Sequence, residues 1–154
     1  MVQKCADRER LKLVRTWTSS EFAVLSGGKQ RYFRGCPVVA QPDRAVPAVS
    51  IVLAATAGVE YQLAMQSACR PNKLGHSGLI ICSAGGRLAH LATVGRELCC
   101  TVLLMEGAVE RLKAAQEVVI DLHHGRLHPA VFELGMVLET SRLMLARSDR
   151  EFDR

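Results

Sequence analysis

Aromatic residues, long apolar runs and paired cysteine motifs are scarce in this sequence, and each shortage excludes a class of protein. Phe, Trp and Tyr make up 5% of the 154 residues, so stacking platforms for nucleic-acid bases are few. The longest apolar stretch, residues 45–59, contains Pro47, Ser50 and Thr56 and is too short to cross a bilayer. We therefore expect a soluble protein with no membrane partner, for which nucleic-acid binding is disfavoured.

The cysteines and histidines do not have the spacing of a metal site. None of the six cysteines forms a CxxC pair. His123 and His124 are adjacent in a predicted turn, so their side chains point in different directions. We expect no metal site. The first fifteen residues are densely charged, unlike a secretory signal peptide, and together with the cysteine pattern this indicates the cytoplasm.

Positive charge is confined to the start of the chain. Residues 1–34 contain eight Lys or Arg against three Asp or Glu, whereas residues 35–154 contain twelve of each. The pattern over 6–18 predicts an amphipathic helix, and we interpret residues 1–34 as a basic helix or linker segment. This segment can be a solvated face, a surface that docks on a partner, or, as a weaker alternative, a contact to nucleic acid.

The remaining sequence predicts one α/β domain. Short apolar runs typical of buried strands alternate with stretches of helical periodicity. Strands are expected at 46–53, 78–82, 101–104 and 117–122. Helices are expected at 59–67, 90–98 and 109–113, with a last helix at 129–146 (its pattern clearest from 130) and a tail at 147–154. One core must carry the function, because the chain is too short for two domains.

The segment between the strand at 78–82 and the helix at 90–98 has the residues of a phosphate site. Gly85 and Gly86 let the backbone turn tightly and approach a ligand closely. A helix N-terminus offers unpaired amides and a partial positive charge to an anion. His90 opens this helix, and a histidine with one unprotonated ring nitrogen is a nucleophile for phosphoryl groups. Arg87 can offset the charge of the phosphate or be an exposed loop residue.

Residues 85–102 read GGRLAHLATVGRELCCTV, and residues 112–127 read LKAAQEVVIDLHHGRL. Both segments resemble the phosphohistidine swivelling domain of the PEP-utilising enzymes, such as pyruvate phosphate dikinase and phosphoenolpyruvate synthase. Gly35-Cys36-Pro37-Val38 is similar to the start of that domain. The resemblance covers residues 35–128 and implies a single β/β/α-layered domain within the α/β class.

The resemblance implies that His90 accepts a phosphoryl group at one active site and donates it at another. Gly85, Gly86 and Arg87 would bind the phosphate, and Arg96 and Glu97 would orient the helix through a salt bridge. The chain itself would bind no cofactor. Mg²⁺ and ATP or phosphoenolpyruvate would belong to partners, which are a nucleotide-binding domain of the ATP-grasp type, a PEP/pyruvate-binding domain, or both.

Ala89 leaves a second interpretation open. A Ser or Thr commonly precedes the histidine in this family, and Ala89 has no hydroxyl to bond a phosphate. The alternative is a catalytically silent interaction module that keeps the swivelling fold and docks through residues 1–34. We expect the chain to be a domain or subunit of a phosphotransferase and not a complete enzyme by itself, because it has no P-loop and no barrel-length sequence.

Overall fold

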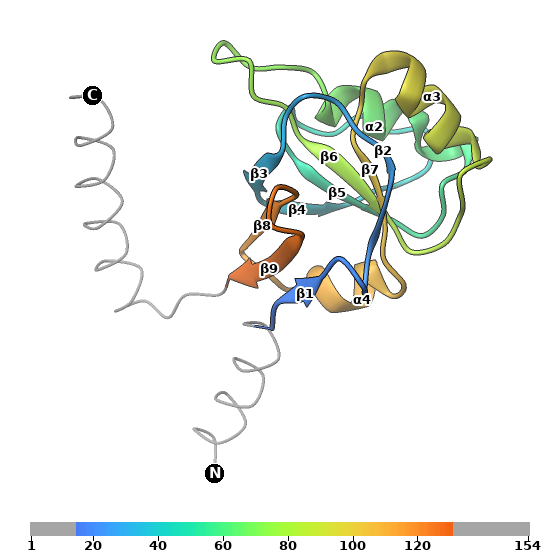
Figure 1. The fold of residues 1–154 in the computed structure, drawn as a ribbon. Helices are drawn as coiled ribbons and strands as arrows, with labels where there is room; N and C mark the ends of the chain where they lie inside the picture. Colours follow the sequence, from blue (N-terminus) through green and yellow to red (C-terminus); the bar gives the residue numbers. More distant parts are fainter. Residues whose placement is uncertain (1–14, 131–154) are drawn as a thin grey trace.

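The structure is a computed structural model that describes residues 15–130. Most of the predicted helix at 6–18, the helix at 130–146 from residue 131 onward, and the tail at 147–154 lie outside the described residues. Within the described range, the chain forms two β-sheets and a few short helices (Figure 1). The expected α/β class is confirmed.

The central sheet has five strands in the order β2-β7-β6-β5-β4. β4, β5, β6 and β7 run parallel, and β2 joins β7 in antiparallel orientation. Its strands are β2 (Ala23–Ser26), β4 (Pro37–Val39), β5 (Ile51–Ala54), β6 (Leu79–Cys82) and β7 (Val102–Leu104). Because the parallel strands end at one edge, the loops after β5, β6 and β7 gather there.

The second sheet is antiparallel throughout and has the order β1-β9-β8-β3. Its strands are β1 (Trp17–Thr18), β3 (Tyr32–Gly35), β8 (Glu117–Asp121) and β9 (Arg126–Ala130). β1 and β9 pair directly, so the described chain begins and ends side by side (Figure 1).

Helices cover the face of the central sheet that is turned away from the second sheet. A 3-10 turn (Val59–Tyr61) leads into α2 (Gln62–Ala68), and α3 (His90–Leu98) lies next to it (Figure 1). α4 (Ala108–Leu112) instead packs Ala108 and Leu112 into the core between the two sheets. No helix in the described range is long and apolar enough to span a membrane.

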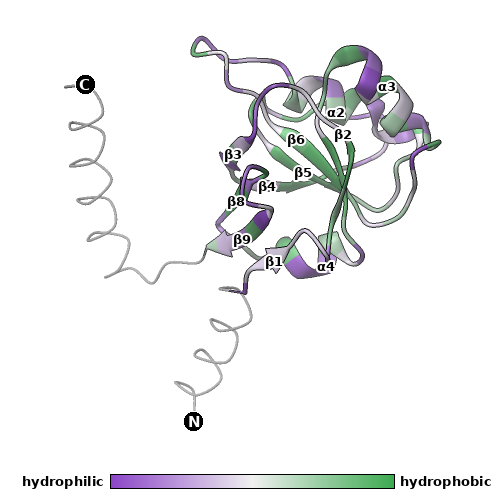
Figure 2. Cartoon of the chain, viewed as in Figure 1, coloured by the Kyte–Doolittle hydropathy of each residue, from purple (hydrophilic) through white to green (hydrophobic). Residues whose placement is uncertain are grey.

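Strand β5 shows why strands of the central sheet are continuous apolar runs in the sequence. All of its residues are buried, and they alternate between two cores. Ile51 and Leu53 face the second sheet, whereas Val52 and Ala54 face the helices. β6 alternates in the same way, and Figure 2 shows both strands as strongly hydrophobic. A sheet covered on both faces needs apolar residues at every position, so its strands do not alternate between apolar and polar residues.

The structure corrects two boundaries at the start of the fold. Trp17 and Thr18, expected at the end of a helix, form strand β1. Trp17, Phe22 and Phe33 are buried in the core between the sheets, so residues 17–34 belong to the domain. The domain therefore starts upstream of residue 35, and the expected boundary falls inside β3. The reason is that these short strands complete both sheets, although charged residues surround them.

The strand expected at 46–53 begins only at Ile51. Pro47 starts a turn that is closed by the backbone amide and the hydroxyl of Ser50, both of which donate to the Pro47 carbonyl oxygen. Val49 lies in this turn with φ +66°, a conformation that a β-branched residue rarely adopts. Ala130, expected in the last helix, is instead the final residue of β9.

Candidate functional site

The predicted phosphate loop lies at the edge where the parallel strands end. The loop leaves β6 at Ser83, whose amide donates to the Ala54 carbonyl oxygen at the end of β5 (2.8 Å). At its other end, the Leu91 amide donates to the Ala57 carbonyl oxygen (3.0 Å). Two hydrogen bonds therefore hold the loop against the loop that follows β5. Ligands of open α/β sheets bind outside this edge, so the position suits a binding site.

The two glycines of this loop are not equivalent. Gly85 has φ +141°, and a Cβ built on it would lie 2.8 Å from the Cβ of Ala57. A Cβ on Gly86 would meet no atom within 4 Å. Gly85 is therefore required by the backbone conformation and by the close approach of residue 57, whereas Gly86 leaves open space above the loop.

We expect Gly85→Ala to destabilise the protein by about 1–3 kcal/mol, because the strained backbone and the contact with Ala57 must both be relieved. Gly86→Ala is the matched control and should change the free energy of unfolding by less than about 0.5 kcal/mol. Urea unfolding of the two variants measures both values. Equal losses in the two variants would contradict the assigned difference between the glycines.

His90 is the first residue of α3, and its side chain is exposed. Its Nε2 lies 2.5 Å from Oε1 of Gln62, the first residue of α2. An amide oxygen only accepts, so Nε2 is the donor in this hydrogen bond, and in the neutral imidazole Nδ1 then carries the lone pair. The arrangement fixes the ring orientation and offers Nδ1 to a ligand. No local sequence pattern indicates Gln62, because 28 residues separate it from His90.

The first turn of α3 provides fewer free amides than an isolated helix N-terminus. The Leu91 amide is bonded to Ala57, and the Thr93 amide bonds the Ala89 carbonyl oxygen (3.1 Å). Ala89 occupies the N-cap position and makes no side-chain capping bond. Ala92 is fully buried, so the His90 amide is the first-turn donor that a phosphate at this position would use.

Arg87 and Arg96 have different surroundings. The Arg87 side chain is exposed and forms no hydrogen bond or ion pair within residues 15–130. Arg96 donates to the carbonyl oxygens of Arg87 (2.8 Å) and Leu25 (3.3 Å), and so connects the loop to β2. The expected salt bridge with Glu97 is absent from the described ion pairs, because the Arg96 guanidinium is committed to carbonyl oxygens. Glu97 is exposed.

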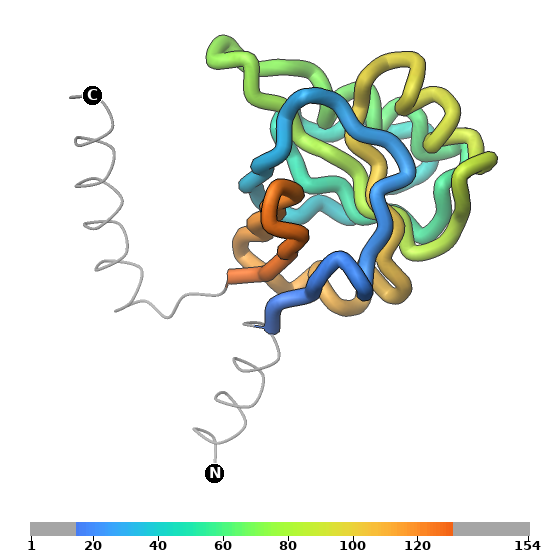
Figure 3. Tube along the Cα trace, in the orientation of Figure 1, coloured from blue at the N-terminus to red at the C-terminus, as the bar shows by residue number. Residues whose placement is uncertain are grey.

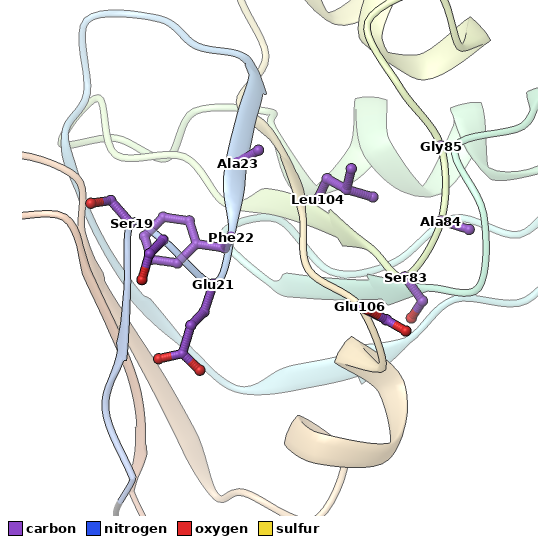
Figure 4. Close-up of a pocket in the computed structure, with 10 residues that line it drawn as sticks. Ser19, Glu21, Phe22, Ala23, Ser83, Ala84, Gly85, Leu104 and Glu106 are labelled. Carbon is purple, nitrogen blue, oxygen red and sulfur yellow. The ribbon is translucent and has the colours of Figure 1, made fainter.

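A shallow groove of about 620 Å³ lies between the loop after β6 and the turn before β2 (Figure 4). Gly85 forms part of its wall, together with Ser83 and the turn before β2. Two carboxylates, Glu21 and Glu106, also line it, and Glu21 pairs with Arg15. Neither His90, Gly86 nor Arg87 is among the lining residues. The acidic groove disfavours a phosphate, so a phosphoryl group on His90 would lie outside it.

Other reactive or metal-binding side chains do not contribute to this site. Cys82 ends β6 immediately before the loop, but burial raises its pKa to about 12, so its thiol is not a nucleophile at neutral pH. His124 Nδ1 lies 2.6 Å from Oδ2 of Asp121, and hydrogen bonds from His124 hold the pKa of that carboxyl below its usual value. Within residues 15–130, no three His, Cys, Asp or Glu residues are grouped to hold a metal ion.

The chain matches no protein-family model and no curated protein.

Proposed function

We propose that the protein is a phosphoryl carrier of the phosphohistidine swivelling type, in which His90 receives a phosphoryl group at one active site and donates it at another. The observation that carries the proposal is the exposed His90 at the start of α3, with one ring nitrogen hydrogen-bonded to Gln62 and the other open. Partner domains would supply ATP or phosphoenolpyruvate, with Mg²⁺, and the acceptor.

The transfer needs no cofactor on this chain. The Nδ1 lone pair of His90 attacks the phosphorus of the donor, and the bond from phosphorus to the leaving oxygen breaks with its electrons going to that oxygen. The Arg87 guanidinium in the adjoining loop and the His90 amide in the first turn of α3 would bind the phosphoryl oxygens. In the second transfer the acceptor attacks phosphorus, and the P–N bond returns its electron pair to Nδ1.

Two features of the fold support a mobile carrier. The layers follow the order sheet, sheet, helices, which is the order implied by the resemblance. The described chain enters and leaves beside β1 and β9, away from α3 (Figure 1). Connections on that side leave the His90 side free to enter an active site.

Ala89 favours a second candidate, a silent interaction module with the same fold. It provides no hydroxyl for a phosphate and no side-chain cap for α3. The two candidates differ in one measurable property. The carrier gains one phosphoryl group, seen as a rise in intact mass, when it is incubated with a donor and its cognate partner. The phosphoramidate is labile in acid and stable in base. If the mass never rises with any donor and partner, the silent module is the better description.

Gln62 is expected to act as a positioning residue for His90. Removing its acceptor oxygen in Gln62→Leu should slow phosphorylation by about tenfold, because a hydrogen bond worth about 0.5–1.5 kcal/mol no longer fixes the proton on Nε2. ³¹P NMR should show the phosphoryl group on Nδ1 in the unsubstituted protein and on both nitrogens in the variant. Gln66→Leu, in the same helix, is the control. An unchanged isomer ratio in Gln62→Leu would contradict the assigned role.

A further inference from the structure

A second groove, of about 620 Å³, lies at the opposite end of the domain from His90. It is formed by the segment leading into β3, the turn before β5 and the loop before β6. Because β5 and β6 are parallel, residues that precede these strands lie at the edge opposite to the phosphate loop. Figure 3 shows the loop before β6 and the loop after it on opposite sides of the molecule.

The charge of this groove is positive. Lys29, Arg31, Arg34 and His76 line it, and none of its lining residues is a carboxylate. Arg34 pairs with Glu117 of β8, so its charge is partly offset. Lys29, Arg31 and His76 belong to none of the ion pairs among the described residues. Two cationic side chains and one imidazole, from two distant segments, are therefore available to an anion.

Hydrogen bonds hold these segments in place. The Gln30 side chain accepts from the amide of Ser77 (2.9 Å) and donates to its carbonyl oxygen (3.1 Å), which connects residues 47 positions apart. The His76 amide donates to Oδ1 of Asn72 (2.9 Å), and the Asn72 amide donates to the His76 carbonyl oxygen (2.8 Å). Val49, in its strained left-handed conformation, forms another part of the wall. Strained backbone that the surroundings maintain is concentrated at ligand sites.

The size and lining of the groove indicate the kind of anion. Its volume of about 620 Å³ is in the range of small-molecule sites. Lys and Arg side chains provide the charge-assisted hydrogen bonds that phosphate oxygens accept. Tyr32, which is 52% exposed, adds an aromatic ring at the groove. We propose that this groove binds the polyphosphate chain of a nucleotide-sized ligand, with Lys29, Arg31 and His76 contacting phosphates and Tyr32 contacting a base.

The proposal is independent of the carrier function, because the groove shares no residue with the phosphate loop. It is tested by isothermal titration of the full chain with ATP and with inorganic tripolyphosphate, both without Mg²⁺. Both probes should bind. Lys29→Gln combined with Arg31→Gln should weaken both by at least about tenfold, since two charge-assisted contacts are lost. Tyr32→Ala should weaken the binding of ATP only. If this variant binds ATP as tightly as the unsubstituted protein does, the groove is assigned to inorganic polyphosphate.

A matched control distinguishes binding at this groove from general electrostatic attraction to the protein surface. Arg111→Gln combined with Lys113→Gln removes the same charges at the same spacing from exposed positions at α4. This control should retain the affinity of both probes. In NMR titrations, shifts should concentrate at Gln30, His76 and Ser77. The proposal is overturned if neither probe binds, if the control loses as much affinity as the groove variant, or if the shifts instead concentrate at residues 86–92.

Discussion

Under the proposed carrier function, His90→Ala should prevent phosphorylation of this protein while leaving the fold intact. Two other candidate nucleophiles near this loop are less suited: Cys82 is buried and protonated at neutral pH, and Ser83 lines the acidic groove, where its Oγ accepts a hydrogen bond from the Val109 amide. We expect the rate of phosphorylation to fall by at least about a hundredfold, because solvent does not replace the imidazole as the nucleophile. Intact-mass measurement after incubation with donor and partner gives the rate directly.

The matched control for this variant is His123→Ala. His123 is also exposed, but it lies in the turn between β8 and β9, where its ring contacts the ring of His124. This variant should be phosphorylated at the same rate as the unsubstituted protein. Both variants should unfold within about 0.5 kcal/mol of it, because both side chains are at the surface. Phosphorylation that persists in His90→Ala would exclude His90 as the carrier.

Gly78→Ala should have the largest effect on stability. Gly78 is buried between the turn before β5 and the end of α2, immediately before β6. A Cβ at this position would lie 2.0 Å from the carbonyl oxygen of Ser50 and 2.9 Å from that of Ala68. Both obstacles are backbone atoms of packed segments and cannot rotate away. We expect a loss of more than about 4 kcal/mol, a large fraction of the stability of a typical domain.

Urea unfolding of Gly78→Ala measures this loss, and failure to accumulate as folded protein is the extreme form of the same result. Gly27→Ala is the control, because its Cβ would make only an ordinary contact of 3.6 Å with Val24. That substitution should change the free energy of unfolding by less than about 1 kcal/mol. If Gly78→Ala unfolds at the same urea concentration as the control, the close packing of Gly78 against Ser50 and Ala68 is contradicted.

Local patterns in the sequence were enough for the elements around the candidate site. The apolar stripe predicted a helix at 90–98, and α3 has those bounds. The apolar run at 78–82 predicted the buried strand that became β6. These elements are strongly patterned, because one packs on a sheet and the other is buried on both faces. The double glycine was also informative, although only Gly85 is constrained by the backbone.

The beginning of the domain could not be predicted in this way. β1 has two residues and β2 and β3 have four each, and these lengths are too short for a periodic pattern. Trp17 was interpreted as part of an amphipathic helix, whereas pairing of β1 with β9 buries it in the core between the sheets. Strand pairing between distant segments decides such elements, and local propensity does not.

The sequence by itself determined the α/β class, the strand that precedes the loop and the position of His90 at the start of a helix. Only the tertiary structure placed Gln62 against the His90 ring, tied the loop to Ala57 and committed Arg96 to carbonyl oxygens. It alone also brought Lys29, Arg31 and His76 to one groove. Helix periodicity and chain turns depend on neighbouring residues, whereas these contacts join residues distant in sequence, which meet only when the sheets and helices pack.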